Sequence, residues 1–158
     1  MTDVAKRPNR LPWPPIIYLA AIAASILLGV LYPLPWIGPP LSEILFAAGF
    51  LVIAAVVAID VAAMRAMRRA NTTIMPNKAS EHLVTTGPFS FSRNPIYLAN
   101  TMLMFGGGLV AGSLWFFLFG FIAALITQKL AIEREERHLT ERFGKRYIDY
   151  AKRVRRWI

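Results

Sequence analysis

The charged residues of this chain occur in separate blocks, and their distribution is the feature that most constrains the fold. No Lys or Arg occurs in residues 11–64, and no charged residue of either sign occurs in residues 94–128. Yet the net charge is +9, while 56% of the 158 residues are hydrophobic. An ordinary soluble domain does not combine these properties. The sequence therefore predicts an all-α integral membrane protein, with residues 1–158 forming a single helical bundle domain.

The uncharged stretches predict about four membrane spans. Residues 16–32 and 41–64 form the first two. The third stretch, residues 94–128, is too long for one span of about 20 residues. Its consecutive glycines, Gly106 to Gly108, divide it into two short halves. We expect a tight helical hairpin there, because glycine allows two helix backbones to approach closely.

The basic residues predict the orientation of the bundle. All 18 lie before residue 11, within residues 65–93, or from Lys129 onward. The positive-inside rule places these three regions in the cytoplasm, so both termini are cytoplasmic and the number of spans is even. We expect a multi-pass protein, in the inner membrane if the source is bacterial. Residues 1–64 then hold the two N-terminal spans, and residues 71–158 form the rest of the domain.

The C-terminal region is expected to form an amphipathic cytoplasmic helix. Its apolar residues recur every three or four positions: Leu139, Phe143, Tyr147, Tyr150, Val154 and Trp157. The opposite face is rich in Lys and Arg, which favours contact with an anionic inner leaflet. A solvated helix packed on the bundle fits equally well. No nucleic-acid partner is expected, because the basic residues lie where the topology already requires them.

The segment between the second and third spans, residues 71–97, is the least generic part of the chain. It is rich in turn-forming residues, yet it also carries the apolar side chains Leu83, Val84 and Phe89. A non-helical apolar segment at a membrane surface is buried in protein or lines a cavity, because its backbone needs partners. Arg93-Asn94-Pro95 ends the segment. It is either part of a ligand site or only a helix start, with Asn94 as the N-cap residue.

Several carboxylates lie close to the predicted membrane surface. Glu133, Glu135 and Glu136 stand at the end of the fourth span. They either form local pairs such as Glu133 with Arg137, or hold a cation or a substrate. Asp60, near the end of the second span, is expected either to extend its side chain to the membrane surface or to pair with Arg65 or Arg68, with a functional role as the alternative. The chain has no Cys and two His, so no metal site is predicted.

Two linked motifs resemble a known family. LVTTGPFSFSRNPIY (residues 83–97) is followed, some forty residues on, by the pattern EExxLxxxFGxxYxxY (residues 135–150). Together they resemble the membrane-embedded methyltransferases that include the isoprenylcysteine carboxyl methyltransferases. The phospholipid N-methyltransferases are more distant relatives. The resemblance extends over about residues 72–157, with the motifs in the same order and at similar spacing.

The resemblance implies an S-adenosylmethionine-dependent methyltransferase with a cofactor pocket at the cytoplasmic face. Glu135 and Arg93 are the implied catalytic residues. The implied cofactor-binding residues are Glu81, His82, Leu83, Val84, Gly87, Phe89, Asn94, Pro95, Ile96, Tyr97 and Glu136. Asn94 stands where many relatives have His, and asparagine does not titrate near neutral pH. This departure favours an acceptor that is already ionised.

The predicted function is therefore methyl transfer to a small lipophilic or lipid-like acceptor, with O-methylation of a carboxylate favoured. Transfer to the amine of an ethanolamine phospholipid is the second interpretation. A non-enzymatic membrane scaffold, in which the motifs are only structural, is the third. An oligomer is compatible with the glycine-rich hairpin but is not predicted.

Overall fold

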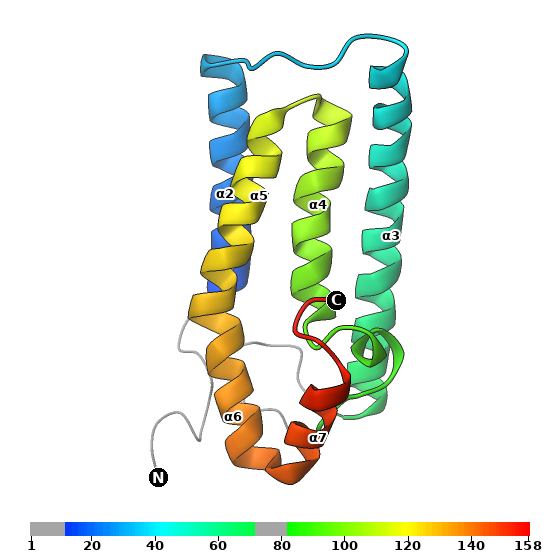
Figure 1. Ribbon diagram of the computed structural model, residues 1–158, viewed down its shortest axis with the longest axis vertical. Coiled ribbons are helices and arrows are strands. Elements are labelled where there is room, and N and C mark those ends of the chain that lie inside the picture. The colour runs from blue at the N-terminus through cyan, green and yellow to red at the C-terminus, as the bar shows by residue number, and fades with distance from the viewer. Residues whose placement is uncertain (1–11, 72–81) are drawn as a thin grey trace.

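The computed structural model describes residues 12–71 and 82–158, and four apolar helices form the body of the protein (Figure 1). They are α2 (Trp13–Leu31), α3 (Leu41–Arg69), α4 (Pro95–Ala111) and α5 (Leu114–Thr127). Helix α3 packs against α4, α4 against α5, and α5 against α2. No strand occurs in the two described ranges. The predicted all-α bundle is confirmed.

Three helices are long and apolar enough to cross a membrane. They are α2, α3 and the continuous helix Leu114–Phe143 that begins as α5. Helix α4 is apolar but has 17 residues, which corresponds to about 26 Å of helix. Large apolar side chains such as Leu19, Leu51 and Leu125 are exposed on the outside of the bundle. Such a surface fits a lipid environment, so the chain is a membrane protein and the predicted count of four spans is approximate.

Glycines set the spacing of α3, α4 and α5. A Cβ atom added at Gly49 of α3 would lie 2.7 Å from Val110 Cγ2 and 2.9 Å from the carbonyl oxygen of Gly106 in α4. A Cβ atom added at Gly108 would lie 2.7 Å from Phe117 Cε2 of α5. Both approaches are closer than a side chain permits. The predicted hairpin of α4 and α5 is confirmed, with glycine at its tightest contacts.

The fourth apolar helix does not end where its uncharged sequence ends. Helix α5 continues through a π-helical turn, η2 (Gln128–Ile132), into the charged helix α6 (Glu133–Phe143). Helix α7 (Lys145–Arg153) follows a break at Gly144, whose φ of 52° suits a residue without a side chain. The expected C-terminal helix is therefore present as two helices. Helices α6 and α7 are charged and lie beyond the uncharged stretch, which ends at Gln128.

The last five residues of the chain contact the residues just before α4. This C-terminal segment, residues 154–158, is not helical. The backbone oxygen of Arg155 accepts a hydrogen bond from the backbone nitrogen of Arg93 at 3.0 Å. Asn94 is the N-cap residue of α4, as predicted, but its side chain makes no capping bond. Its Nδ2 instead donates to the backbone oxygen of Arg156 at 2.9 Å.

Candidate functional site

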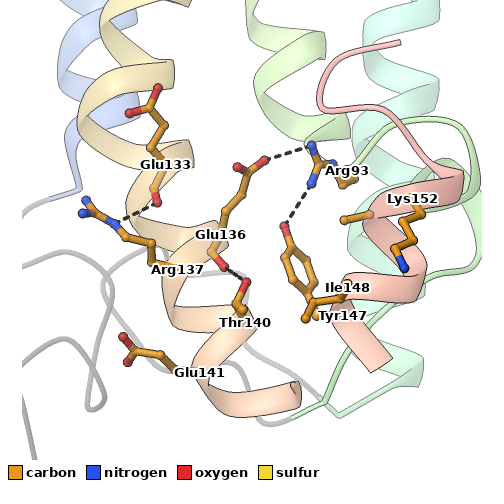
Figure 2. Close-up of a pocket in the computed structure, with 10 residues that line it drawn as sticks. Arg93, Glu133, Glu136, Arg137, Thr140, Glu141, Tyr147, Ile148 and Lys152 are labelled. Atoms are coloured by element: carbon orange, nitrogen blue, oxygen red, sulfur yellow. Dashed lines mark hydrogen bonds and ion pairs between the residues drawn. The ribbon is translucent and has the colours of Figure 1, made fainter. Parts of the chain in front are cut away.

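A carboxylate held between two arginines lies at the charged end of the bundle. Glu136 of α6 accepts from Arg156 through both oxygens, at 2.9 Å from Nε and 2.7 Å from Nη2. Arg93, in the segment before α4, places Nη2 at 3.2 Å from the same carboxylate (Figure 2). The side chains of Arg93 and Glu136 are 16% and 17% exposed. This arrangement carries one net positive charge, which suits an anionic group of a ligand.

The neighbouring carboxylate, Glu135, has a different environment. The hydroxyl group of Tyr97 in α4 donates to Glu135 Oε1 at 2.7 Å. Burial of the carboxyl group raises the pKa of Glu135, the Tyr97 hydrogen bond lowers it, and the charge of Glu136 raises it, so that it reaches about 7 against an ordinary 4.5. Glu135 therefore changes its charge near neutral pH, and it can accept or release a proton there.

A large cavity lies between α6 and α7. It has a volume of about 700 Å³, and its wall includes Arg93, Glu136, Thr140, Tyr147 and Lys152 (Figure 2). Charged groups of both signs line it, so it suits a ligand that carries both a cation and an anion.

Two smaller cavities adjoin Arg93. One of about 300 Å³ is mainly apolar and is lined by residues from the starts of α2 and α4 and by Met67 of α3. It contains the predicted residues Phe89, Asn94, Pro95, Ile96 and Tyr97. The other, of about 70 Å³, contains His82, Leu83 and Val84 together with Leu139, Tyr147 and Tyr150. Arg93 lines all three cavities.

The segment before α4 is held in place by α7. The hydroxyl group of Tyr150 donates to the backbone oxygen of Phe89 at 2.6 Å. Phe89 lies in a short 3₁₀ turn, η1 (Gly87–Ser90), which begins with Gly87 at a φ of 62°. Only glycine adopts this conformation without strain. The structure thus places Gly87 in the turn that positions Phe89.

Most predicted site residues lie around Arg93, but some sequence expectations need correction. Glu81 lies outside the described residues. Glu133 binds Lys129 Nζ at 2.8 Å, whereas Arg137 Nε donates only to the backbone oxygen of Glu133, so the expected side-chain pair of Glu133 and Arg137 is wrong. Asp60 forms no pair with a nearby arginine, and within the described part of the chain its Oδ1 has no hydrogen-bond partner. Local pairing also does not account for Glu136, whose partner Arg93 is distant in sequence.

Sequence reasoning missed the role of Arg156. The sequence places it only among the basic residues of the amphipathic region. Its contact with Glu136 depends on the break at Gly144 and on the path of the C-terminal segment, which no local pattern indicates. Trp157 adds a second link, since its Nε1 donates to Gln128 Oε1 at 2.9 Å.

Comparison with known proteins gives the family. The family model described as phospholipid methyltransferase matches residues 44–146, from α3 to the start of α7. The chain belongs to the phospholipid methyltransferase family. No curated protein matches the chain. The match contains Arg93, Tyr97, Glu135 and Glu136, whereas α2 and the C-terminal segment lie outside it.

Methyltransferases generally use S-adenosylmethionine as the methyl donor, and the residues present fit this cofactor. S-adenosylmethionine carries a carboxylate, an ammonium and a sulfonium group. Among the described residues, Arg93 Nε is buried and has no hydrogen-bond partner, so a carboxylate would satisfy it. Glu133 and Glu141, which line the charged cavity, supply negative charge for the cationic groups. The cavity of about 700 Å³ is also large enough for a ligand of this size.

Proposed function

We propose that this protein transfers a methyl group from S-adenosylmethionine to a lipid-like acceptor at the cytoplasmic face of the membrane. The observation that carries the proposal is the position of Arg93. It lines a charged cavity between α6 and α7 and also a mainly apolar cavity at the starts of α2 and α4. A polar cofactor fits the first cavity, and the reacting end of an apolar acceptor fits the second.

The chain's own residues contribute positioning and charge. S-adenosylmethionine supplies a methyl group bound to a sulfonium. Arg93 orients the carboxylate of the cofactor, and Glu136 fixes Arg93 through their contact at 3.2 Å. Tyr97 orients Glu135 by its hydrogen bond of 2.7 Å. The reaction is a displacement, for which correct placement of the two reactants is a major contribution to the rate.

The proton balance bears on the choice of acceptor. A carboxylate acceptor needs no base, and the sequence favours it because Asn94 does not titrate. An ammonium acceptor must lose one proton before its nitrogen lone pair forms the new bond. Glu135, joined to Tyr97 at the start of α4 and with a pKa of about 7, can accept that proton. This geometry supports an amine such as that of ethanolamine phospholipids.

Labelled methyl transfer tests both parts of the proposal. The purified protein in detergent is incubated with methyl-labelled S-adenosylmethionine and a bilayer lipid extract. We expect label in the lipid fraction, with the Glu135→Gln variant strongly reduced and the Glu43→Gln variant, changed at an exposed residue in the first turn of α3, close to wild type. Label that base releases as volatile methanol identifies a methyl ester, whereas label that stays on a non-volatile head group identifies an amine product. Failure of the folded protein to bind S-adenosylmethionine contradicts the proposed function.

A further inference from the structure

The C-terminal segment, residues 154–158, connects three parts of the site. Its backbone binds the two residues before α4, Arg93 and Asn94. Its side chains bind Glu136 of α6 and Gln128 of the π-helical turn. The segment lies outside the part of the chain that matches the family. It therefore adds contacts to the site that the family match does not account for.

Within this segment, Arg156 makes the strongest contact. Its guanidinium binds both oxygens of Glu136, at 2.9 and 2.7 Å, whereas Arg93 reaches one oxygen at 3.2 Å. A two-point contact between Arg and a carboxylate is stronger and more directional than a single one. Of the two arginines, Arg156 therefore holds Glu136 more firmly.

This unequal sharing leaves much of the Arg93 guanidinium without a strong partner. Its Nη1 lies 3.5 Å from the Tyr147 hydroxyl group, at the outer limit for a hydrogen bond (Figure 2). Its Nε is buried and has no partner within residues 12–71 and 82–158. Without Arg156, the carboxylate of Glu136 would be free to take both of its bonds from Arg93. The guanidinium would then turn toward α6 and present fewer N–H groups to the cavities.

We propose that Arg156 is a positioning residue: by occupying Glu136, it keeps the N–H groups of Arg93 available for an anionic group of the bound ligand. The inference rests on the proposed function, under which that anionic group is the carboxylate of S-adenosylmethionine. Arg156 itself acts only through Glu136 and Arg93.

The test compares two ligands that differ in the carboxylate alone. The full-length protein in detergent is titrated calorimetrically with S-adenosylmethionine and with its decarboxylated form, which keeps the sulfonium and the amine. Arg156→Gln removes the two-point contact. Arg155→Gln is the matched control, because it removes the same charge from an exposed neighbour whose contact with Arg93 is made by its backbone.

The expected result is a loss of discrimination. Wild type and Arg155→Gln should bind S-adenosylmethionine at least about tenfold more tightly than the decarboxylated form, since a charged hydrogen bond is lost with the carboxylate. Arg156→Gln should bind the two ligands within about twofold of each other. In this variant the affinity for S-adenosylmethionine should decrease, while the affinity for the decarboxylated form stays unchanged.

Four results would overturn the inference. If Arg156→Gln lowers the affinity for both ligands equally, Arg156 has a structural role only. Discrimination equal to that of Arg155→Gln shows that Arg156 does not act on Arg93. If wild type binds both ligands equally, the protein does not recognise the carboxylate. That result does not contradict the proposed methyl transfer. If wild type binds neither ligand, the proposed function fails, and the inference fails with it.

Arg156→Lys covers the case in which Arg156→Gln does not fold. An ammonium group keeps the charge but cannot make the two-point contact. We expect about a threefold selective loss of S-adenosylmethionine affinity in this variant. Unchanged discrimination in folded Arg156→Lys protein would then overturn the inference.

Discussion

The hydroxyl group of Tyr97 donates a hydrogen bond of 2.7 Å to Glu135 Oε1, and this bond joins the start of α4 to α6. It connects the two sequence motifs, which are separated by the whole hairpin of α4 and α5. The bond also determines which way the Glu135 carboxylate faces.

Removal of this bond should slow the reaction. We expect Tyr97→Phe to lower the rate constant for methyl transfer about tenfold, since one hydrogen bond to a charged group is lost and no bulk is changed. Single-turnover measurement with labelled S-adenosylmethionine checks this. Tyr32→Phe is a suitable control, because Tyr32 is exposed and follows the C-terminal end of α2, whereas Tyr97 lines a cavity with the start of α2. Equal rates in wild type and Tyr97→Phe would show that the bond is not used.

The activity should depend on pH near neutrality. The pKa of Glu135 is raised to about 7, mainly by burial, so the carboxylate gains its charge as the pH rises through that value. If the charged form is the active one, kcat/KM increases through pH of about 7. Because the Tyr97 bond lowers this pKa, the midpoint should move upward in Tyr97→Phe. A flat profile between pH 6 and 8 (about one unit on each side of this pKa) would contradict the assignment of Glu135.

The same carboxyl group affects stability in the opposite sense. Its pKa in the folded protein is about 7, above the ordinary 4.5, so the folded state binds the proton more tightly than the unfolded state. Its contribution to stability is fully present below about pH 4.5 and is lost as the pH rises through about 7. The thermal unfolding temperature in detergent should therefore decrease less, as the pH rises across this range, for Glu135→Gln than for wild type.

Loss of the charge at Glu136 should destabilise the fold. Glu136→Gln leaves Arg93 and Arg156 without a counter-charge, and the Glu136 side chain is only 17% exposed. We expect a loss of about 2 kcal/mol of unfolding free energy, below the range for a fully buried pair because Arg156 is 32% exposed. Glu133→Gln is the matched control, since Glu133 pairs with the largely exposed Lys129. Chemical denaturation in detergent should show little change for that control.

The contact of α3 with α4 should tolerate no added side chain at Gly49. Gly49→Ala places a methyl group 2.9 Å from the backbone oxygen of Gly106, which cannot move away as a flexible side chain would. We expect a loss of about 1–3 kcal/mol, as for other overpacked contacts. Gly38→Ala is the control, because nothing lies within 4 Å of its added Cβ atom. Similar unfolding temperatures for both variants would show that the helices can separate without cost.

The elements that could be predicted from the sequence are those set by local chemistry. The absence of charge over residues 94–128, with glycines near its middle, was sufficient to predict the α4–α5 hairpin. Asn94 and Pro95 were sufficient to predict the start of α4. The choice of the site residues that lie around Arg93 came from the family resemblance rather than from their spacing in the sequence.

Contacts that depend on the path of the chain could not be predicted. In the sequence, Gly144 is compatible with one amphipathic helix that has a minor interruption. In the structure, its positive φ turns α7 back along α6. Only that turn brings Arg156 to Glu136 and Tyr150 to Phe89. The side chain of Asn94 likewise bonds the C-terminal segment rather than its own helix, a choice that no pattern within residues 71–97 determines.

The π-helical turn at Gln128–Ile132 has a consequence for how this sequence can vary. A π turn holds one residue more than the α-helical turn it replaces, so every residue beyond it is out of phase with α5 by one position. A regular α-helix through the same number of residues would rotate Glu135 and Glu136 by about 100° around its axis. Both carboxylates would then face away from Tyr97 and Arg93. Deletion of one residue within the turn cancels this offset and keeps both carboxylates in place, whereas loss of the π geometry without a deletion would separate the two halves of the site.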